Sequence, residues 1–421
     1  MRSRRGYDTR SVRVAFLLKD LQLSGGVGVV VTHARNLATL GDHEVTLVTT
    51  RPRREPDWEY SHLPHLRTLP LEEAINERFD VAVSTWWETA YELFMLDAGR
   101  YSSFVQSVED RFYEGYESVD RLGARVTLDL PVAFITEAAW IADTLTGLRP
   151  DAQVHLVRNG IDKETFPLAA EPPVARDGAP LRVIVEGDPA IWFKGVGDAL
   201  EAVDAMSEPC ELTLVCPNRL GLKPRHAAMA VGPLTGPEMA AAFSGSDVLL
   251  KLSRVEGMYG PPLEAFRCGA TCVTTEVTGS EEYIRHGENA LVCDWDDPGG
   301  TAAQLDMLAR DRELLGRLRS GALATAAGWP DWPEASEAMA RALEEIACSP
   351  PPEPYAGARE LMLTLGAGIA KERGARGYYR KLRADAGRWQ RVNSLPVVGS
   401  ALSARRRLKS RLGRDEGSAG S

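Results

Sequence analysis

The order of short apolar runs along the chain constrains its fold more than any other feature. Val12–Leu18 is a mostly apolar run of the length that forms a buried parallel strand. It is followed by a glycine-rich turn at Ser24–Gly28, by helical apolar spacing over Val29–Leu40 and by a second strand-like run at Glu44–Thr50. This order predicts a βαβ unit, which opens a doubly wound α/β domain. Further strands are expected at Asp80–Ser84, Ser103–Gln106, Val132–Ile135 and Val154–Val157.

The same alternation starts again after residue 180. Leu181–Val185 is a strand-like run, and Gly197–Met206 has helical spacing. The remaining strands of this half are expected at Leu212–Cys216, Val248–Leu252, Thr271–Thr275 and Leu291–Cys293. Pro172–Pro180 is rich in proline and lies between the two halves, which is typical of a linker. An expected helix that ends near Ile346 follows the segment Trp329–Pro333.

Length and pattern together predict an α/β protein with two Rossmann-like domains. A chain of 421 residues is too long for one ordinary core. We assign residues 11–168 to the first domain, 169–180 to the linker and 181–350 to the second domain. Two such domains facing a central cleft offer a common kind of ligand site. Residues 1–10 are expected to form a disordered basic N-terminus, and residues 351–421 a basic helical extension.

The net charge of −10 hides an asymmetry between the tail and the rest of the chain. Residues 355–421 contain 15 Lys and Arg against 5 Asp and Glu, a balance of +10, so residues 1–354 carry −20. An acidic body does not resemble a nucleic-acid-binding protein, and no nucleic-acid partner is expected. The basic, partly amphipathic tail can lie on an anionic membrane surface. A solvated, partly helical tail is the alternative.

Neither a membrane span nor a secretory signal is expected. No run approaches the roughly 18 apolar residues that a transmembrane helix needs, and no apolar stretch follows the charged N-terminus. The six cysteines form no CxxC pair, which favours reduced thiols in the cytoplasm. His62 and His65 have no acidic or cysteine partner nearby, so no structural metal is expected. The predicted location is cytoplasmic, with peripheral binding to the inner face of the membrane through the tail.

Two glutamates, Glu256 and Glu264, lie in the most informative segment, residues 253–275. This segment is expected to form a loop, a helix whose first turn contains Pro261 and Pro262, and a buried strand. Glu256 then lies on the loop and Glu264 about one turn inside the helix. The unpaired amides of the first helical turn form an anion site between them. Carboxylates for sugar and ribose hydroxyls, beside amides for a diphosphate, are the groups that a nucleotide-sugar site needs.

The segment resembles the E-x7-E signature of family-4 glycosyltransferases, which are retaining enzymes of the GT-B fold. The resemblance implies that Glu256 contacts the donor sugar, that Glu264 contacts the nucleotide ribose and that the amides of Gly257–Gly260 hold the phosphates. Two other stretches also resemble family patterns, Val157–Asp162 with Phe166 at the domain link and Gly279–Val292 after the signature. The likeness therefore extends over residues of about 12 to 346, and Trp329–Pro333 with its helix resembles the family's closing element.

Lys194, within the Phe-Lys-Gly element that ends at Gly195, resembles the lysine with which the family binds the donor diphosphate. A fixed ammonium stabilises the charge that develops on a departing diphosphate. Gly187 lies in the loop before this lysine and is a further donor-side candidate. Gly25 and Gly26 resemble the family's glycine pair, where the backbone comes close to the donor phosphate or to the acceptor.

The chain departs from the family pattern at two places. The family usually has an arginine a few residues before the lysine, and Asp188 stands near that position here. Either Arg254 supplies the second positive charge or the diphosphate binds less tightly than usual. In the signature, Met258, Tyr259 and Gly260 stand where the family commonly has Phe, Gly and Leu. A tyrosine at a glycine position is expected to narrow the sugar pocket or to shift the phosphate loop, and so to change the sugar preference.

Polar residues of the first half are candidates for the acceptor side. Ser84–Tyr91 and Phe104–Tyr113 resemble the family branch that includes bacterial rhamnosyltransferases of surface polysaccharides. Many family members have a histidine near the position of Gln106. The acceptor-side candidates here are Gln106, Glu109 and Glu137, and the sequence assigns none of them as a general base.

The resemblance implies a retaining glycosyltransferase whose donor is a nucleotide-diphosphate sugar, with no metal and no further cofactor. Glu256 and Lys194 are the predicted catalytic residues, and the departing diphosphate would help to deprotonate the acceptor. The acceptor is expected to be a glycan or a lipid-linked sugar of cell-surface polysaccharide or glycolipid synthesis. Two alternatives stay open: a GT-B protein that binds nucleotide as a partner or scaffold without transferring sugar, and a GT-B sugar-nucleotide epimerase.

Overall fold

The computed structural model describes residues 11–40, 43–51, 65–171, 178–216, 230–350 and 355–394. Several sequence predictions concern residues outside these ranges: the basic N-terminus 1–10, His62, the linker residues 172–177 and the tail beyond residue 394. The described residues form two parallel sheets with helices, which confirms the predicted α/β class with two Rossmann-like domains.

The first sheet has seven parallel strands in the order β3-β2-β1-β4-β5-β6-β7. The strands are β1 (Arg13–Leu18), β2 (Glu44–Thr49), β3 (Arg67–Pro70), β4 (Arg78–Ser84), β5 (Asp97–Val105), β6 (Ala133–Thr136) and β7 (Val154–Leu156). The α-helices between them are α1 (Gly25–Leu40), α2 (Leu71–Ala74), α3 (Trp87–Ala90), α4 (Ser118–Val126) and α5 (Ala139–Leu148). The strand order changes direction between β1 and β4, and ligands of open parallel sheets bind at the carboxyl ends of strands at such a switch point.

The second sheet has six parallel strands in the order β10-β9-β8-β11-β12-β13, with its switch point between β8 and β11. The strands are β8 (Leu181–Glu186), β9 (Cys210–Val215), β10 (Ala230–Val231), β11 (Val248–Lys251), β12 (Thr271–Thr275) and β13 (Ala290–Cys293). The α-helices are α6 (Val196–Asp204), α7 (Gly236–Ser244), α8 (Gly260–Arg267), α9 (Pro298–Arg310) and α10 (Arg312–Ala327).

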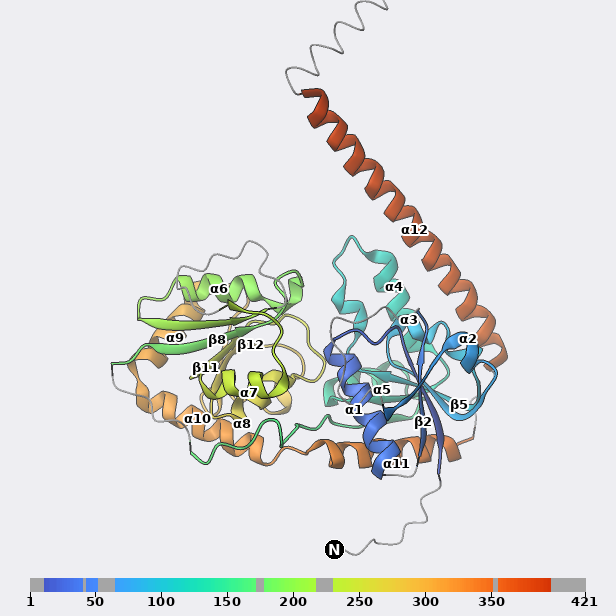
Figure 1. Cartoon of the computed structure of the whole chain (residues 1–421), viewed down its shortest axis with the longest axis horizontal. Coiled ribbons are helices and arrows are strands. Elements are labelled where there is room, and N and C mark those ends of the chain that lie inside the picture. Colours follow the sequence, from blue (N-terminus) through green and yellow to red (C-terminus); the bar gives the residue numbers. More distant parts are fainter. Residues whose placement is uncertain are drawn as a thin grey trace, which may run out of the picture. The chain divides into compact units, whose positions relative to one another are not determined.

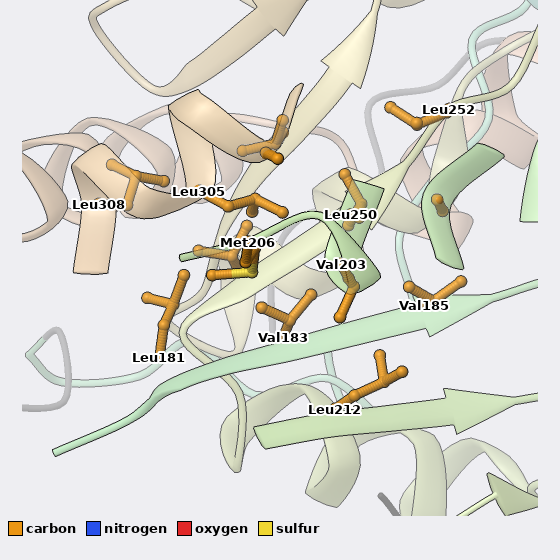
Figure 2. Close-up of a cluster of buried hydrophobic side chains, with 14 of the residues drawn as sticks. Leu181, Val183, Val185, Val203, Met206, Leu212, Leu250, Leu252, Leu305 and Leu308 are labelled. Atoms are coloured by element: carbon orange, nitrogen blue, oxygen red, sulfur yellow. The ribbon is translucent and has the colours of Figure 1, made fainter. Parts of the chain in front are cut away.

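Alternating strand residues build the core of the second domain. Successive side chains of a strand point to opposite faces of the sheet, so Val183 and Val185 of β8 share a face with Leu250 of β11. Figure 2 shows these side chains with Leu305 and Leu308 of α9, and all five are nearly or fully buried. This packing fixes the strand ends from which the candidate site is built.

Helix α11 (Trp332–Cys348) follows the second domain in the chain but packs on the first. Its buried residues Met339 and Ile346 belong to the core around the first sheet, and α11 lies beside α1 in Figure 1. Just before this helix, Trp329 Nε1 donates to the backbone O of Asn159 at 2.9 Å. The predicted closing helix is therefore present, and it returns the chain to the first domain.

The chain divides into two compact units, residues 1–363 and 364–421. Helix α12 (Tyr355–Ser394) begins in the first unit, where Ala358 and Met362 are buried, and continues in the second. The predicted helical extension is thus confirmed over Tyr355–Ser394. Among the described helices, none combines the length and the apolar character that a membrane span requires.

Candidate functional site

The predicted donor residues gather at the switch point of the second sheet, at the carboxyl ends of β8 and β11. β8 ends at Glu186, and Gly187 follows it with a φ of 142°. β11 ends at Lys251, and the next loop carries Glu256 to the start of α8. As predicted, α8 has prolines in its first turn. These elements bring the ends of two adjacent strands and the N-terminus of a helix to one edge of the sheet.

Lys194 and Glu256 are in direct contact. The Lys194 Nζ lies 2.9 Å from Glu256 Oε1 and 3.1 Å from Glu256 Oε2. The following residue, Gly195, has a φ of 62°, and a Cβ there would lie 1.9 Å from the backbone O of Leu252, so this turn requires glycine. Burial raises the pKa of Glu256, but the attraction of Lys194 and then of Lys251 outweighs burial, and the pKa lies below its ordinary value. Glu256 is therefore an ionised carboxylate.

Lys251 is a member of this cluster that the sequence analysis missed. Its side chain is only 2% exposed, its ammonium forms an ion pair with Glu186, and its Nζ lies 4.0 Å from Glu256 Oε1. Burial lowers the pKa of Lys251, yet the attraction of Glu186 and Glu256 leaves the pKa above its ordinary value. A lysine inside the apolar run Val248–Leu252 was the signal in the sequence, since lysine is seldom fully buried without a partner.

Glu264 is partly buried in α8, one turn from the helix start. Burial, followed by the repulsion of Glu186, raises the pKa of Glu264 to about 8. Near neutral pH the Glu264 carboxyl is therefore mostly protonated, so it can donate one hydrogen bond as well as accept others.

The Tyr259 ring lies in the core of the second domain and is fully buried. Its hydroxyl donates to the backbone O of Lys251 at 2.9 Å and lies 2.8 Å from Thr274 Oγ1. A ring without exposed surface does not narrow a solvent-accessible sugar pocket. Of the two effects expected from the sequence, a shift of the phosphate loop is the one compatible with this position, because the Tyr259 hydroxyl links the end of that loop to β11.

Residues 252–259, between β11 and α8, form the predicted donor loop, and this loop contacts the first domain at Gly257. A Cβ at Gly257 would lie 1.8 Å from the backbone O of Gln106 and 2.9 Å from Glu137 Oε1, so only glycine fits. The Met258 amide donates to Glu137 Oε1 at 3.0 Å, and Trp140 Nε1 donates to the backbone O of Gly257 at 3.0 Å. The structure thus brings the donor loop against two of the three acceptor-side candidates.

The three acceptor-side candidates have different surroundings. Burial raises the pKa of Glu137 to about 7, although hydrogen bonds from Met258 and Asn159 act in the opposite direction. Gln106 Nε2 donates to the backbone O of Gly26 at 3.3 Å, beside the start of α1. Glu109 is buried within the first domain, where the Trp87 amide donates to it at 2.6 Å and burial raises its pKa well above the ordinary value.

The other predicted donor-side glycines, Gly25, Gly26 and Gly187, differ in how closely their surroundings approach. A Cβ on Gly26 would lie 3.3 Å from the Gln106 side chain, whereas a Cβ on Gly25 would meet no atom within 4 Å. A Cβ on Gly187 would lie 3.0 Å from Val196 Cγ2 and 3.5 Å from Lys194 Cβ. Close packing therefore favours glycine at Gly26 and Gly187. At Gly25 no contact demands it.

The side chains of Arg254 and Asp188 both bond to groups nearby. Arg254 Nη2 lies 2.7 Å from Asp198 Oδ2 and 2.5 Å from Asp296 Oδ1, and these hydrogen bonds raise the pKa of the guanidinium. Asp188 Oδ1 accepts a hydrogen bond from the Ala190 amide at 2.9 Å. To act as the second phosphate cation, Arg254 would have to leave two carboxylates, and that role stays a prediction.

A second set of contacts joins the domains close to Glu256. Arg111 Nη1 donates to Thr278 Oγ1 at 3.0 Å, and Thr278 Oγ1 donates to the backbone O of Glu256 at 3.2 Å. The rings of Phe112 and Phe193 stack with their centroids 5.0 Å apart, immediately before Lys194. No sequence motif distinguished these contacts, because they depend on how the two domains meet.

A metal centre is not apparent in the described ranges, which hold no group of three or more His, Cys, Asp or Glu side chains placed to bind an ion. The expectation that the reaction needs no metal stays a prediction.

Comparison with known proteins relates the second domain to a family. Residues 182–311 match the family described as glycosyl transferases group 1. The N-acetyl-alpha-D-glucosaminyl L-malate synthase of Bacillus anthracis is 38% identical over 76 residues, which are 18% of this chain and 20% of that protein. The alignment thus spans about a fifth of the length of that relative.

Solved structures resemble a much larger part of the chain. Sucrose-phosphate synthase from Thermosynechococcus elongatus has a TM-score of 0.64 and 15% identity, covering 80% of this chain and 99% of the other. Anabaena HepE, solved in complex with UDP and glucose, has a TM-score of 0.62 and 14% identity, covering 79% and 100%. At this identity the likeness concerns the fold, and the rhamnosyltransferase branch stays a prediction. The chain has the predicted GT-B fold, and it contains, over residues 182–311, a domain of the glycosyl transferases group 1 family.

Proposed function

We propose that this protein is a retaining glycosyltransferase that transfers a sugar from a nucleotide-diphosphate sugar to an acceptor hydroxyl. The observation that carries the proposal is the Lys194–Glu256 contact of 2.9 Å at the carboxyl edge of the second sheet, beside the start of α8. An ammonium and free helix amides can stabilise a diphosphate, and Glu256 can accept hydrogen bonds from sugar hydroxyls. Glu264 is placed further along the same helix, where a ribose would be held.

The related proteins support a nucleotide-sugar donor. One relative is named N-acetyl-alpha-D-glucosaminyl L-malate synthase, and HepE was solved in complex with UDP and glucose. UDP-sugars are accordingly the first donors to test. The proposed division of work assigns the donor to the second domain and the acceptor to the first, in keeping with the contact between Gly257 and Gln106.

In the proposed mechanism the protein mainly positions the reactants and stabilises charge. Lys194 and the amides of Gly257–Gly260 stabilise the diphosphate as the glycosidic bond breaks. Glu256 orients the sugar, and the departing diphosphate takes the proton of the acceptor hydroxyl on the same face of the sugar, which gives retention. The cationic lysine and the helix amides would supply the charge that a metal ion supplies in other transferases.

The test is turnover with a panel of donors. UDP-glucose, GDP-mannose, dTDP-rhamnose and ADP-glucose are each incubated with the purified protein and a panel of glycan acceptors, and released nucleoside diphosphate is measured. We expect release from one donor class and a loss of about 100-fold or more in Lys194→Met. Lys371→Met, which changes an exposed lysine of α12, is the matched control and should retain activity. A product with inverted anomeric configuration would contradict retention.

One observation favours a second candidate, a GT-B protein that binds nucleotide without transferring sugar. Arg254, the residue expected to supply a second phosphate cation, is paired with Asp198 and Asp296. Nucleotide binding without turnover of any donor would support this candidate. Conversion of a donor to its epimer in the absence of an acceptor would instead support an epimerase.

The acceptor and the membrane are further parts of the proposal. We assign the acceptor to cell-surface polysaccharide or glycolipid synthesis, and the basic tail to an anionic membrane surface near a lipid-linked acceptor. Ala358 and Met362 are buried in the first unit, so a protein truncated after residue 363 keeps these packing contacts, whereas one truncated after residue 354 loses them. Sedimentation with phosphatidylglycerol vesicles tests the tail. Equal pelleting of the full chain and of residues 1–363 would contradict membrane binding through it.

A further inference from the structure

The carboxylate of Glu256 lies between two lysines that differ sharply in exposure. The Lys194 side chain is 26% exposed, and its ammonium bonds both Glu256 oxygens at 2.9 and 3.1 Å. The Lys251 side chain is 2% exposed, and its Nζ lies 4.0 Å from Glu256 Oε1. One cation can therefore turn toward solvent and a ligand, whereas the other is enclosed by protein.

Lys251 is fixed in place by its own neighbours. It is the last residue of β11, its backbone O accepts the Tyr259 hydroxyl at 2.9 Å, and its ammonium is paired with Glu186. The buried strand end and the ion pair hold this ammonium in place, 4.0 Å from Glu256 Oε1. The Lys251 ammonium therefore cannot move to contact a diphosphate, whereas the more exposed Lys194 side chain can.

Donor binding as proposed above creates competition for Lys194. Two of its contacts go to Glu256 oxygens, the same oxygens that sugar hydroxyls need. A diphosphate carries more negative charge than one carboxylate and attracts the ammonium away from Glu256. The Glu256 side chain is only 11% exposed, so without a second cation it would be left as a buried, unpaired charge.

We propose that Lys251 is a positioning residue of the donor site, which keeps Glu256 ionised and in place when Lys194 moves to the donor diphosphate. This inference rests on the proposed function. Lys251 then supplies the second cation beside Glu256, while the Arg254 guanidinium is paired with Asp198 and Asp296.

The first test measures the ionisation of Glu256 directly in the full chain, with no ligand present. Glutamate carboxyls are labelled with 13C, and the Glu256 signal is identified by its loss in Glu256→Gln. Lys194→Met imitates the departure of Lys194. If Lys251 is the remaining counter-ion, the Glu256 midpoint in Lys194→Met stays below pH 7. A midpoint above pH 7 in this variant would overturn the proposal without any change at Lys251.

A matched pair of variants isolates the charge of Lys251. We compare a double variant, Lys194→Met/Glu186→Gln, with the triple variant that also carries Lys251→Met, so that the two differ by one buried ammonium. Both carry Glu186→Gln because removal of Lys251 would otherwise leave the Glu186 carboxylate without its partner. At 4.0 Å, the loss of that charge should raise the Glu256 midpoint by on the order of one to three pH units. A shift of less than about 0.3 unit would refute the proposal, because a merely structural lysine would not hold the Glu256 charge.

The proposed function is tested separately by titrating the unaltered protein and Lys251→Met/Glu186→Gln with UDP, GDP, dTDP and ADP at pH 7. Binding of one of the four, accompanied by proton uptake only in the double variant, is the expected result, since Glu256 then loses both cations. If no nucleoside diphosphate binds the unaltered protein, the proposed function fails, whereas the carboxyl midpoints still decide whether Lys251 holds the charge of Glu256.

Discussion

Replacing Glu264 with glutamine should stabilise the protein at neutral and alkaline pH, even though Glu264 belongs to the proposed donor site. The pKa of Glu264 is raised to about 8, chiefly by burial and then by Glu186. The folded protein therefore keeps this carboxyl protonated at pH values where the unfolded chain releases the proton. Stability is lost as the pH rises from the ordinary pKa of the carboxyl toward about 8. Glutamine has nearly the same shape and cannot ionise in either state.

The magnitude follows from the two pKa values. Each pH unit between the unfolded and the folded pKa changes the unfolding free energy by about 1.4 kcal/mol per group. For Glu264 the cost at pH 7 is at most about 3 kcal/mol, and below pH 5 it is under about 1 kcal/mol. Because Glu264 is only partly buried, the realised cost is expected to be smaller. Glu137, with a pKa of about 7, adds a cost of the same sign and is unchanged in the variant.

Thermal unfolding at pH 5 and at pH 8 provides the assay. Glu264→Gln should melt close to the unaltered protein at pH 5 and several degrees higher at pH 8. The exposed Glu281, changed to glutamine, is the matched control and should show little difference at either pH. A difference between Glu264→Gln and the unaltered protein that is the same at both pH values would refute the reasoning, because it would not come from ionisation.

Three further outcomes are expected. Lys194→Met should lower kcat/KM by about 100-fold while moving the melting temperature little, since the Lys251 ammonium stays 4.0 Å from Glu256 Oε1 and keeps that carboxylate paired. Equal losses of activity and of thermal stability would contradict a catalytic role. Gly257→Ala should weaken nucleotide binding and lower the melting temperature, because its Cβ would lie 1.8 Å from the Gln106 carbonyl oxygen. An unchanged donor KM would argue against a role of this domain contact in donor binding. Burial lowers the pKa of His33 to about 3, so its contribution to stability should fall as the pH drops below its ordinary value, by about 2 kcal/mol between pH 7 and pH 5. His33→Gln, which retains a polar group near Ser336, should unfold with less dependence on acid pH in urea titrations at pH 7 and pH 5.

Strands with strong apolar runs were predictable, and short edge strands were not. β1, β8 and β12 are buried and apolar or β-branched, and their positions agree with the prediction within one residue. β3 and β10 have four and two residues and lie at the edges of their sheets, so each is too short to give a recognisable strand pattern in the sequence. Their pairing depends on neighbouring strands that bring them into register.

The donor loop was predictable because its residues are close in sequence, and its surroundings were not. Glu256, the helix start and Glu264 follow one another within a short segment, whose backbone form follows from proline and glycine chemistry. The contact of Glu256 with Lys194 joins the segments that follow β8 and β11, which are far apart in the sequence, so this contact could not be predicted without the fold. The side chain of Tyr259 illustrates the same point, because its position in the sequence suggested the pocket and its burial places it in the core.

Isothermal titration with UDP, GDP, dTDP and ADP shows whether the Lys194–Glu256 edge of the second sheet binds a nucleoside diphosphate. We expect saturable binding of one of the four, lost in Lys194→Met and in Glu264→Ala but retained in Lys371→Met. Binding of a nucleoside diphosphate that is equally strong in Lys194→Met, or no binding of any of the four to the unaltered protein, would contradict it.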